Sequence, residues 1–431
     1  MKISFFQGIL FGTFGLAALI GLFVFATHTS TSNNASGIGT VVIWGTLSKA
    51  GIEATLAATG QIDPTFKNAA VSYVQKSPST LASDLASAIA TGNAPDLVLA
   101  SQEELHTLTK FIAPVSLSTL PARTFTSAFV GEGGILAAQN GAGYWGVPFL
   151  VDPLVLFTNR AILASNGIAK PPATWEALVG LVPRIAQLTP SRQITRGLIA
   201  LGTYDNVHNA RGILSSLFLQ TGVPVSGYAS NGVLSSDLGS SSSGQAVLGF
   251  YTQFTDPSKV SYTWNASLND SQQSFLAGDL ALYLGYASEA RFLRAANPNL
   301  DFDVAPLPQP GTATTKTAYG LLYSFMIPRG SANAAGAYQV AALLTNSSEQ
   351  DAAAANTGLA PAALSVLGTS PADPIAAVAY AEALYTRGWL SPAPADTDAV
   401  FSGMIGNVIS GRLNLQSALV SAERSLSSLL Q

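Results

Sequence analysis

The chain has 431 residues, of which only 10% are charged, and its formal net charge is −4. This length is sufficient for two lobes with a core each, and the absence of any run of Lys or Arg excludes the usual basic surface of a nucleic-acid-binding protein. The sequence contains no cysteine, which excludes disulfides, thiolate metal sites, cysteine nucleophiles and a lipid-modified cysteine anchor, and we expect neither a metal nor a cofactor.

The N-terminal segment predicts a membrane anchor. No Asp, Glu, Lys or Arg lies between Lys2 and Lys49, and residues 8–27 form an apolar run that is long enough to span a bilayer as a helix. We therefore predict an uncleaved, single-pass signal anchor over residues 1–28, followed by a flexible polar linker over residues 29–39.

The flanks of this segment predict its orientation. Lys2 places the N-terminus inside the cell, so the rest of the chain lies outside, in the extracellular or periplasmic space. The alternative is a signal peptide that is cleaved after about Ala26 or Ser36, although neither position offers a clean A-x-A-like site.

The next segment alternates strand and helix patterns. Residues 41–44, 69–77 and 96–100 read as strands, and helices are predicted from Lys49 onward and over residues 81–90. This βαβαβ order predicts an α/β lobe with a largely parallel sheet.

The block from Gly143 to Leu178 combines a long strand with a capped helix. The strand over residues 145–157 is almost wholly apolar, as expected for a strand that is covered on both faces. Asp152 interrupts it, and a buried carboxylate needs either a partner inside the protein or a ligand. Thr174 is a predicted cap for a helix that begins at the following residue.

The remaining half of the chain is predicted to be richer in helix. Residues 185–300 read as mostly helical, with a Ser/Gly-rich surface insertion at 226–244. Residues 301–333 read as a strand, a Pro-rich loop, a second strand and a turn into an Ala-rich helix. The closing helix over residues 415–429 places Leu and Ala side chains at helical spacing on one core-facing side.

Several sequence blocks, in a fixed order, resemble those of one protein family. Besides residues 143–178, the blocks are TVVIWGT (40–46), TGNAPDLVLAS (91–101), SFLAGDLALYLGYASEA (274–290), TGLAPA (357–362) and ISGRLNLQSAL (409–419). In order and spacing they are similar to the extracellular solute-binding proteins of family 1, the maltose-binding-protein-like receptors of ABC importers.

The resemblance implies an α/β, two-lobed, periplasmic-binding-protein-like fold of type II, in which the lobes close on a ligand. It assigns residues 40–150 with 323–362 to lobe 1, and residues 151–322 with 363–431 to lobe 2. It also implies a monomer that captures a small polar solute, most simply a sugar, and delivers it to the permease subunits of an ABC transporter.

The resemblance and the local chemistry together give a set of candidate ligand-binding residues. They are Trp44, Thr46, Ser48, Ser101, Asp152, Asn206, His208, Trp264, Tyr286, Tyr319 and Tyr323. For most of them a structural role is the alternative. Trp44 and Trp264 would then be packed aromatic residues, and Asp152 would form a salt bridge in the hinge. Asn206 and its neighbour Asp205 would form a turn and helix cap.

The identity of the solute is predicted from ring positions and charge. Tyr286 matches a position where sugar-binding members of the family carry Trp or Tyr, whereas Ser101 stands near one where they often carry an aromatic residue. The candidate segments offer only Lys49, Arg211 and Arg291 as cations, and an anionic ligand usually needs such groups. We therefore predict a neutral carbohydrate.

Two other functions remain open from the sequence. A membrane-anchored glycoside hydrolase would need two carboxylates at a defined separation, but the sequence shows only scattered acids and none of the common catalytic motifs. We therefore expect no enzymatic activity. A sensory or surface protein that keeps the binding fold without a transporter is compatible with the same sequence.

Overall fold

The computed structural model describes residues 37–239 and 242–431. The predicted signal anchor over residues 1–28, and all but the end of the predicted linker, lie outside the described residues. In the described part of the chain, no helix has both the length and the apolar composition needed to cross a membrane.

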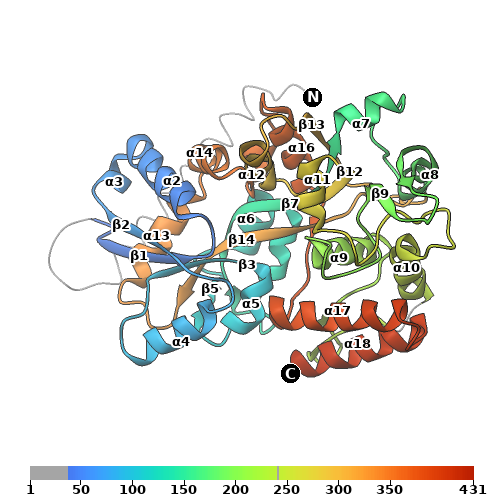
Figure 1. Cartoon of the computed structure of the whole chain (residues 1–431). Helices are drawn as coiled ribbons and strands as arrows, with labels where there is room; N and C mark the ends of the chain where they lie inside the picture. Colours follow the sequence, from blue (N-terminus) through green and yellow to red (C-terminus); the bar gives the residue numbers. More distant parts are fainter. Residues whose placement is uncertain (1–36, 240–241) are drawn as a thin grey trace.

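Two lobes lie on either side of a pair of long central strands (Figure 1). A twelve-stranded sheet runs through both lobes in the order β2 (Ala70–Gln75), β1 (Thr40–Gly45), β3 (Leu97–Ser101), β14 (Ala318–Pro328), β7 (Val147–Asn159), β12 (Leu280–Tyr286), β9 (Ile194–Ile199) and β8 (Gln187–Leu188). Four short strands pair with the central β7 and β14, namely β4 (Ile112–Ala113), β13 (Phe302–Ala305), β15 (Ala360–Pro361) and β16 (Thr386–Arg387). The predicted two-lobed α/β fold is confirmed.

The first lobe is built on the parallel strands β1, β2 and β3. They are connected by α2 (Lys49–Ile62), α3 (Pro64–Lys67) and α4 (Leu81–Ala90). All of β3 is buried, as expected for a strand covered on both faces. The predicted βαβαβ order and the predicted bounds of α4 are confirmed.

Further elements complete this side of the molecule. Between β3 and β7 lie α5 (Gln102–Leu108), β4, β5 (Val115–Ser116), α6 (Ala122–Ala128), a 3₁₀ helix (Gly131–Leu136) and β6 (Gly143–Tyr144). After β14 the chain forms α13 (Ala334–Leu344), α14 (Ser347–Thr357), β15 and α15 (Leu364–Leu367), and α14 packs against α2. The predicted strand, turn and Ala-rich helix after residue 301 are confirmed.

The central strand β7 joins the two lobes. All thirteen of its residues are buried. Up to Pro153 it pairs with β14, and from Leu154 onward it pairs with β12, so its partner changes in the middle of the strand. Gly320 of β14 lies so close that a Cβ there would be 2.9 Å from the carbonyl oxygen of Asp152, which explains the need for glycine at this crossing.

The second lobe contains more strand than predicted. Residues 185–300 are not mostly helical, because they also contribute β8, β9 and β12 to the sheet. Within the predicted insertion 226–244, β10 (Gly227–Tyr228) and β11 (Leu234–Ser235) form a small hairpin. The run LALYLGY that forms β12 is short and continuously apolar, and periodicity alone does not separate a buried strand of this kind from a buried helix.

The helices of the second lobe cover this part of the sheet. They are α7 (Arg160–Ser165), α8 (Trp175–Ile185), α9 (Ala210–Gln220), α10 (Ser242–Thr252), a 3₁₀ helix (Gln253–Thr255), α11 (Ser271–Ala277), α12 (Glu289–Ala296) and α16 (Pro374–Ala383). The predicted cap of α8 is confirmed, since the Thr174 hydroxyl accepts a hydrogen bond of 3.2 Å from the Ala177 amide.

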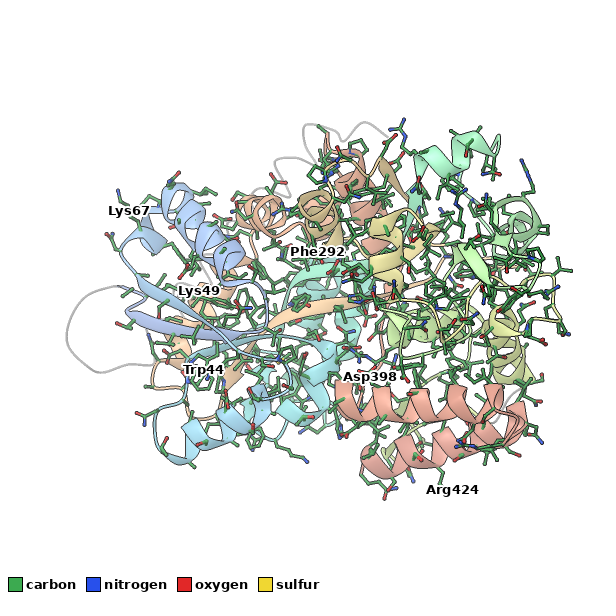
Figure 2. The ribbon with its side chains drawn as sticks, viewed as in Figure 1. Trp44, Lys49, Lys67, Phe292, Asp398 and Arg424 are labelled. Carbon is green, nitrogen blue, oxygen red and sulfur yellow. The ribbon has the colours of Figure 1, made fainter. Side chains whose placement is uncertain are left out.

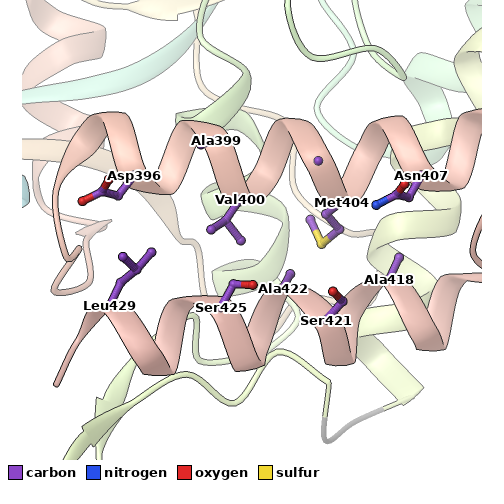
Figure 3. A pocket seen from close by; sticks show the side chains of 11 residues that line it. Asp396, Ala399, Val400, Met404, Asn407, Ala418, Ser421, Ala422, Ser425 and Leu429 are labelled. Atoms are coloured by element: carbon purple, nitrogen blue, oxygen red, sulfur yellow. The ribbon is translucent and has the colours of Figure 1, made fainter.

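Two antiparallel helices close the chain, α17 (Pro394–Ile409) and α18 (Leu415–Leu429). The bounds of α18 match the prediction, and Leu419, Ala422 and Leu426 are buried as predicted, whereas Leu429 is 43% exposed. A groove of about 300 Å³ runs between the two helices and is lined mostly by small and apolar side chains, together with Asp396 and Asn407 (Figure 3).

Candidate binding site at the lobe junction

A cluster of polar side chains, largely buried, lies where the two lobes meet; we call it the junction cluster. Its members are Glu103 and Glu104 of α5, Asp152 of β7, Arg211 of α9, Tyr286 at the end of β12, Tyr319 and Tyr323 of β14, and Asp398 of α17, which is labelled in Figure 2. Hydrogen bonds or electrostatic interactions connect each of them to others of the set. The first lobe and the second lobe both contribute to the cluster.

Arg211 forms the ionic centre of the junction cluster. Its Nε and Nη2 atoms lie 2.9 and 2.8 Å from the two carboxylate oxygens of Glu103, which is a bidentate pair. Its Nη1 atom lies 2.5 Å from Asp398 Oδ2. The hydroxyl of Tyr319 donates to Glu103, and the hydroxyl of Tyr204 donates to Asp398, both at 2.5 Å. All three guanidinium nitrogens are therefore engaged inside the protein.

Asp152 is buried in the middle of β7 and is held by one serine. The amide and hydroxyl of Ser288 donate to its two oxygens at 3.0 and 2.6 Å. Burial raises the pKa of Asp152 to about 7, although both hydrogen bonds from Ser288 act in the opposite direction. Its partner is thus a serine at the start of α12, and no salt bridge of Asp152 is found in the described part of the chain. A ligand contact of Asp152 stays a prediction.

Two tyrosines of the cluster have unused hydroxyls. Tyr286 and Tyr323 are half-buried, and no side chain or backbone group in the described part of the chain forms a hydrogen bond with either phenol. Burial raises the pKa of both well above the usual value, and nearby carboxylates add to the effect. The Tyr286 hydroxyl packs on Gly212, where a Cβ would lie only 2.8 Å away. Unpaired phenols beside carboxyls can bind a polar ligand.

Ser101 acts through its neighbours in the cluster. Its hydroxyl donates to Glu104 Oε2 at 2.5 Å and accepts from the Glu103 amide at 3.2 Å, so that it caps α5. Glu104 is only 8% exposed, and burial raises its pKa to about 7. The predicted residue Ser101 therefore positions the two glutamates that follow it.

Three further candidates lie near the end of β1, with Trp44 inside the strand and Thr46 and Ser48 directly after it. Lys76 Nζ lies 3.9 Å above the ring of Trp44, which is half-buried. The amide of Thr46 donates to a backbone carbonyl of β3, and Ser48 is exposed at the start of α2. No hydrogen bond or ion pair between these residues and the junction cluster is found in the described part of the chain, so their role in binding stays a prediction.

The candidates in the second-lobe loop mainly support one another. The Asn206 amide donates to the carbonyls of Asn265 and Leu268, and its Oδ1 accepts from Trp264 Nε1 at 3.3 Å. Trp264 is only 1% exposed, which agrees with the alternative of a packed aromatic residue. His208 Nδ1 lies 3.5 Å from the carboxylate of Asp270.

Sequence reasoning missed three acidic residues of this region, Glu103, Glu104 and Asp398. Gln102, Glu103 and Glu104 directly follow β3, and polar residues at the carboxyl end of a parallel strand are a general signal for a ligand site. The Gln102 side chain donates to Gly320 O and accepts from the Leu322 amide, so it fastens α5 to β14. Asp398 lies far away in the sequence, and no local pattern marks it.

The charge of the cluster is acidic, with Arg211 as the sole cation among its members. In the described part of the chain, no group of three or more His, Cys, Asp or Glu side chains is arranged to hold a metal ion. The arrangement offers hydroxyls, carboxyls and aromatic faces, which suit the non-covalent binding of a polar molecule.

Comparisons with known proteins agree on the family and the fold. The sequence matches the model of the bacterial extracellular solute-binding proteins over residues 61–380. No curated protein sequence matches the chain at a significant level.

Solved structures share the fold at low identity. The cyclic α-maltosyl-1,6-maltose binding protein from Arthrobacter globiformis is 16% identical, with a TM-score of 0.74 over 91% of this chain and 98% of its own. A cyclo/maltodextrin-binding protein complexed with maltotetraose is 15% identical, with a TM-score of 0.74 over 93% and 99%. The maltose/maltodextrin-binding domain from Bdellovibrio bacteriovorus bound to maltotriose is 15% identical, with a TM-score of 0.66 over 90% and 99%.

Proposed function

The chain belongs to the family of bacterial extracellular solute-binding proteins, and from this premise we propose that the junction cluster binds a small neutral carbohydrate between the two lobes. The observation that carries the proposal is the pair of unpaired hydroxyls on Tyr286 and Tyr323, beside the buried carboxyls of the cluster. A sugar presents an apolar C–H face to an aromatic ring and hydroxyls to polar groups, so these two tyrosines offer it both kinds of contact.

The state of Arg211 favours a neutral solute over an anion. Its guanidinium is occupied by Glu103, Asp398 and the carbonyl of Pro394, so it offers little to a phosphate or carboxylate ligand. The excess of carboxyls in the cluster would also repel an anion. Two of the solved structures named above are described as bound to maltotetraose or maltotriose, which supports the carbohydrate class.

The pairing of the acids supports binding without catalysis. A glycoside hydrolase needs one free carboxylic acid and a second free carboxylate across the scissile bond. Both oxygens of Asp152 are held by Ser288, and both oxygens of Glu103 are held by Arg211. Glu104 then remains without a second free acid in the cluster.

Delivery to an ABC transporter follows from the family, and we place the protein at the outer face of the cell membrane. The apolar run over residues 8–27 supports a single-pass anchor. We propose that the protein is a monomer, in which residues 40–150 with 323–362 form lobe 1 and residues 151–322 with 363–431 form lobe 2. The alternative is a surface or sensory protein without a transporter. Genes for two permease subunits and an ATPase beside the gene for this chain would favour transport.

The test is a calorimetric titration of the chain with maltose, maltotetraose, mannobiose and tagatose. We expect one of these neutral sugars to bind, and Tyr286→Phe and Tyr323→Phe each to weaken that binding about three- to tenfold, because each loses one hydrogen bond worth about 1 kcal/mol. The matched control is Tyr228→Phe, since Tyr228 is 43% exposed on the β10 hairpin and should leave binding unchanged. Binding of anions but not of any sugar would contradict the proposal.

A further inference from the structure

The ion triplet of Glu103, Arg211 and Asp398 joins segments of both lobes. Glu103 lies in the first turn of α5, directly after β3 of the first lobe. Arg211 lies in the first turn of α9, and Asp398 lies in α17, which packs against α9, α10 and α18 of the second lobe. We propose that this triplet is an interlobe latch that holds the two lobes together when no solute is bound.

The burial of the triplet makes it suited to this role. Glu103 is 3% exposed, and its two oxygens accept hydrogen bonds from Arg211 Nε, Arg211 Nη2 and the Tyr319 hydroxyl. The Arg211 side chain is 20% exposed. Salt and water weaken such a pair much less than an exposed one, and its bidentate geometry fixes the orientation of α5 relative to α9.

Neighbouring contacts reinforce the same connection. The Ser216 hydroxyl on α9 accepts from the Tyr319 amide at 2.9 Å, so Tyr319 contacts both the glutamate of one lobe and the arginine-bearing helix of the other. The Thr107 hydroxyl of α5 donates to the Pro392 carbonyl at 2.8 Å, just before α17 begins. These contacts surround the triplet on both sides.

The other ion pairs differ from the latch. Among the residues that the structure describes, the pairs Lys49–Glu53, Lys76–Asp84, Arg160–Asp301 and His208–Asp270 each join groups of a single lobe. The Glu103–Arg211–Asp398 triplet therefore forms the ionic connection between lobes in the described ranges. Two-lobed receptors of this fold move by hinge closure, so a buried pair across the hinge biases the closed state.

The latch rests on the proposed function, because the same junction would hold the solute. A solute that enters must fit beside the paired side chains or separate them. Without the latch, the empty protein should populate a wider opening between the lobes.

The absence of native cysteine makes a direct distance measurement possible. Cysteines introduced at Lys67 of α3 and Arg424 of α18 are exposed and lie toward opposite ends of the molecule (Figure 2), so two spin labels there report the separation of the lobes. The full chain is measured by pulsed electron resonance without any added sugar. We expect one narrow main distance in the parent, and a shift of the distribution to longer distances in Glu103→Gln and in Arg211→Gln.

Two further variants keep the test decisive. Asp398→Asn should give a smaller shift, because its side chain is 44% exposed and the bidentate pair survives. Lys49→Gln, which breaks an exposed pair within the first lobe, should give none. If every latch variant that folds, as judged by circular dichroism, keeps the parent distance distribution, the latch is wrong. Since no sugar is used, failure to bind carbohydrate would overturn the proposed function and leave this result intact.

Discussion

Two glutamates near the lobe junction, Glu103 and Glu289, are satisfied in opposite ways. Glu103 faces the guanidinium of Arg211, which comes from the other lobe. Glu289 forms no ion pair with any residue that the structure describes. Its oxygens accept from the Asn209 and Gln272 side-chain amides, the Tyr283 hydroxyl and the Tyr286 amide, all of them neutral donors of the second lobe.

The two environments correspond to two roles. Glu103 belongs to the contact between the lobes, whereas Glu289 supports the structure inside one lobe. A network of neutral donors within one lobe holds Glu289 in place whatever the other lobe does, and it fixes the backbone of Tyr286. A charge pair between lobes depends on their relative position. Loss of Glu289 should therefore cost stability alone, whereas loss of Glu103 or Arg211 should also change the separation of the lobes.

The largest expected effect comes from Arg211→Met. This change leaves the carboxylate of Glu103 buried and unpaired, which should lower the free energy of unfolding by about 4 kcal/mol. The double variant Glu103→Gln/Arg211→Met should lose less than the sum of the two single variants, because it no longer buries an unpaired charge. Urea denaturation of the four proteins measures the coupling. Additive losses would mean that the two side chains do not act as a pair.

The next largest effect is expected for Glu289→Ala, which should lower the free energy of unfolding by about 3 kcal/mol. This change leaves the donors of Asn209, Gln272 and Tyr283 without their acceptor. The same denaturation experiment applies. The matched control is Glu53→Ala, whose side chain is 54% exposed in the pair with Lys49 and should change stability by less than about 0.5 kcal/mol. A change in the interlobe distance of Glu289→Ala would remove the distinction drawn between the two glutamates.

The sequence predicted the fold well where local signals and chain order agree. The βαβαβ order, the bounds of α4 and α18 and the cap at Thr174 were all readable, because each depends on nearby residues. β12 was missed because its continuous apolar run carries no period. Its role as a strand is decided by β7, which pairs with it along most of its length.

The candidate site was only partly predictable. Tyr286, Tyr319, Tyr323 and Asp152 follow from the family resemblance, and the structure brings them together in one cluster. Asp398 could not be found in the same way, because its contact with Arg211 joins positions 187 residues apart. Such pairs are created by the packing of lobes and leave no trace in spacing along the chain.

The third prediction concerns pH and tests Asp152, which, like Glu289, accepts hydrogen bonds from neutral donors. Burial raises its pKa from 3.8 to about 7, so the folded state holds the proton more tightly than the unfolded state. This contribution to stability is therefore present at low pH and is lost as the pH rises from about 4 to about 7. Glu104, Glu132 and Glu382 are shifted in the same direction.

We therefore expect the chain to be more stable at pH 5 than at pH 8. Asp152→Asn should remove part of that difference, on the order of 2 kcal/mol, because one pKa unit corresponds to about 1.4 kcal/mol and the site relaxes on ionisation. Thermal and urea unfolding at several pH values measure it. A pH dependence equal to that of the parent would show that Asp152 does not titrate as its burial requires.

The smallest expected effect is that of Asp398→Asn, and it shows how far the latch extends beyond Glu103. The Asp398 side chain is 44% exposed, and Arg211 keeps its bidentate partner when the charge is removed, so the loss in unfolding free energy should be about 0.5 kcal/mol and should shrink at high salt. A loss as large as that of Arg211→Met would mean that α17 is as much a part of the connection as α5. The connection between the lobes, which contrasts with the support of Glu289 inside one lobe, would then comprise the three helices α5, α9 and α17. Arg211 would need both carboxylates to hold the lobes together.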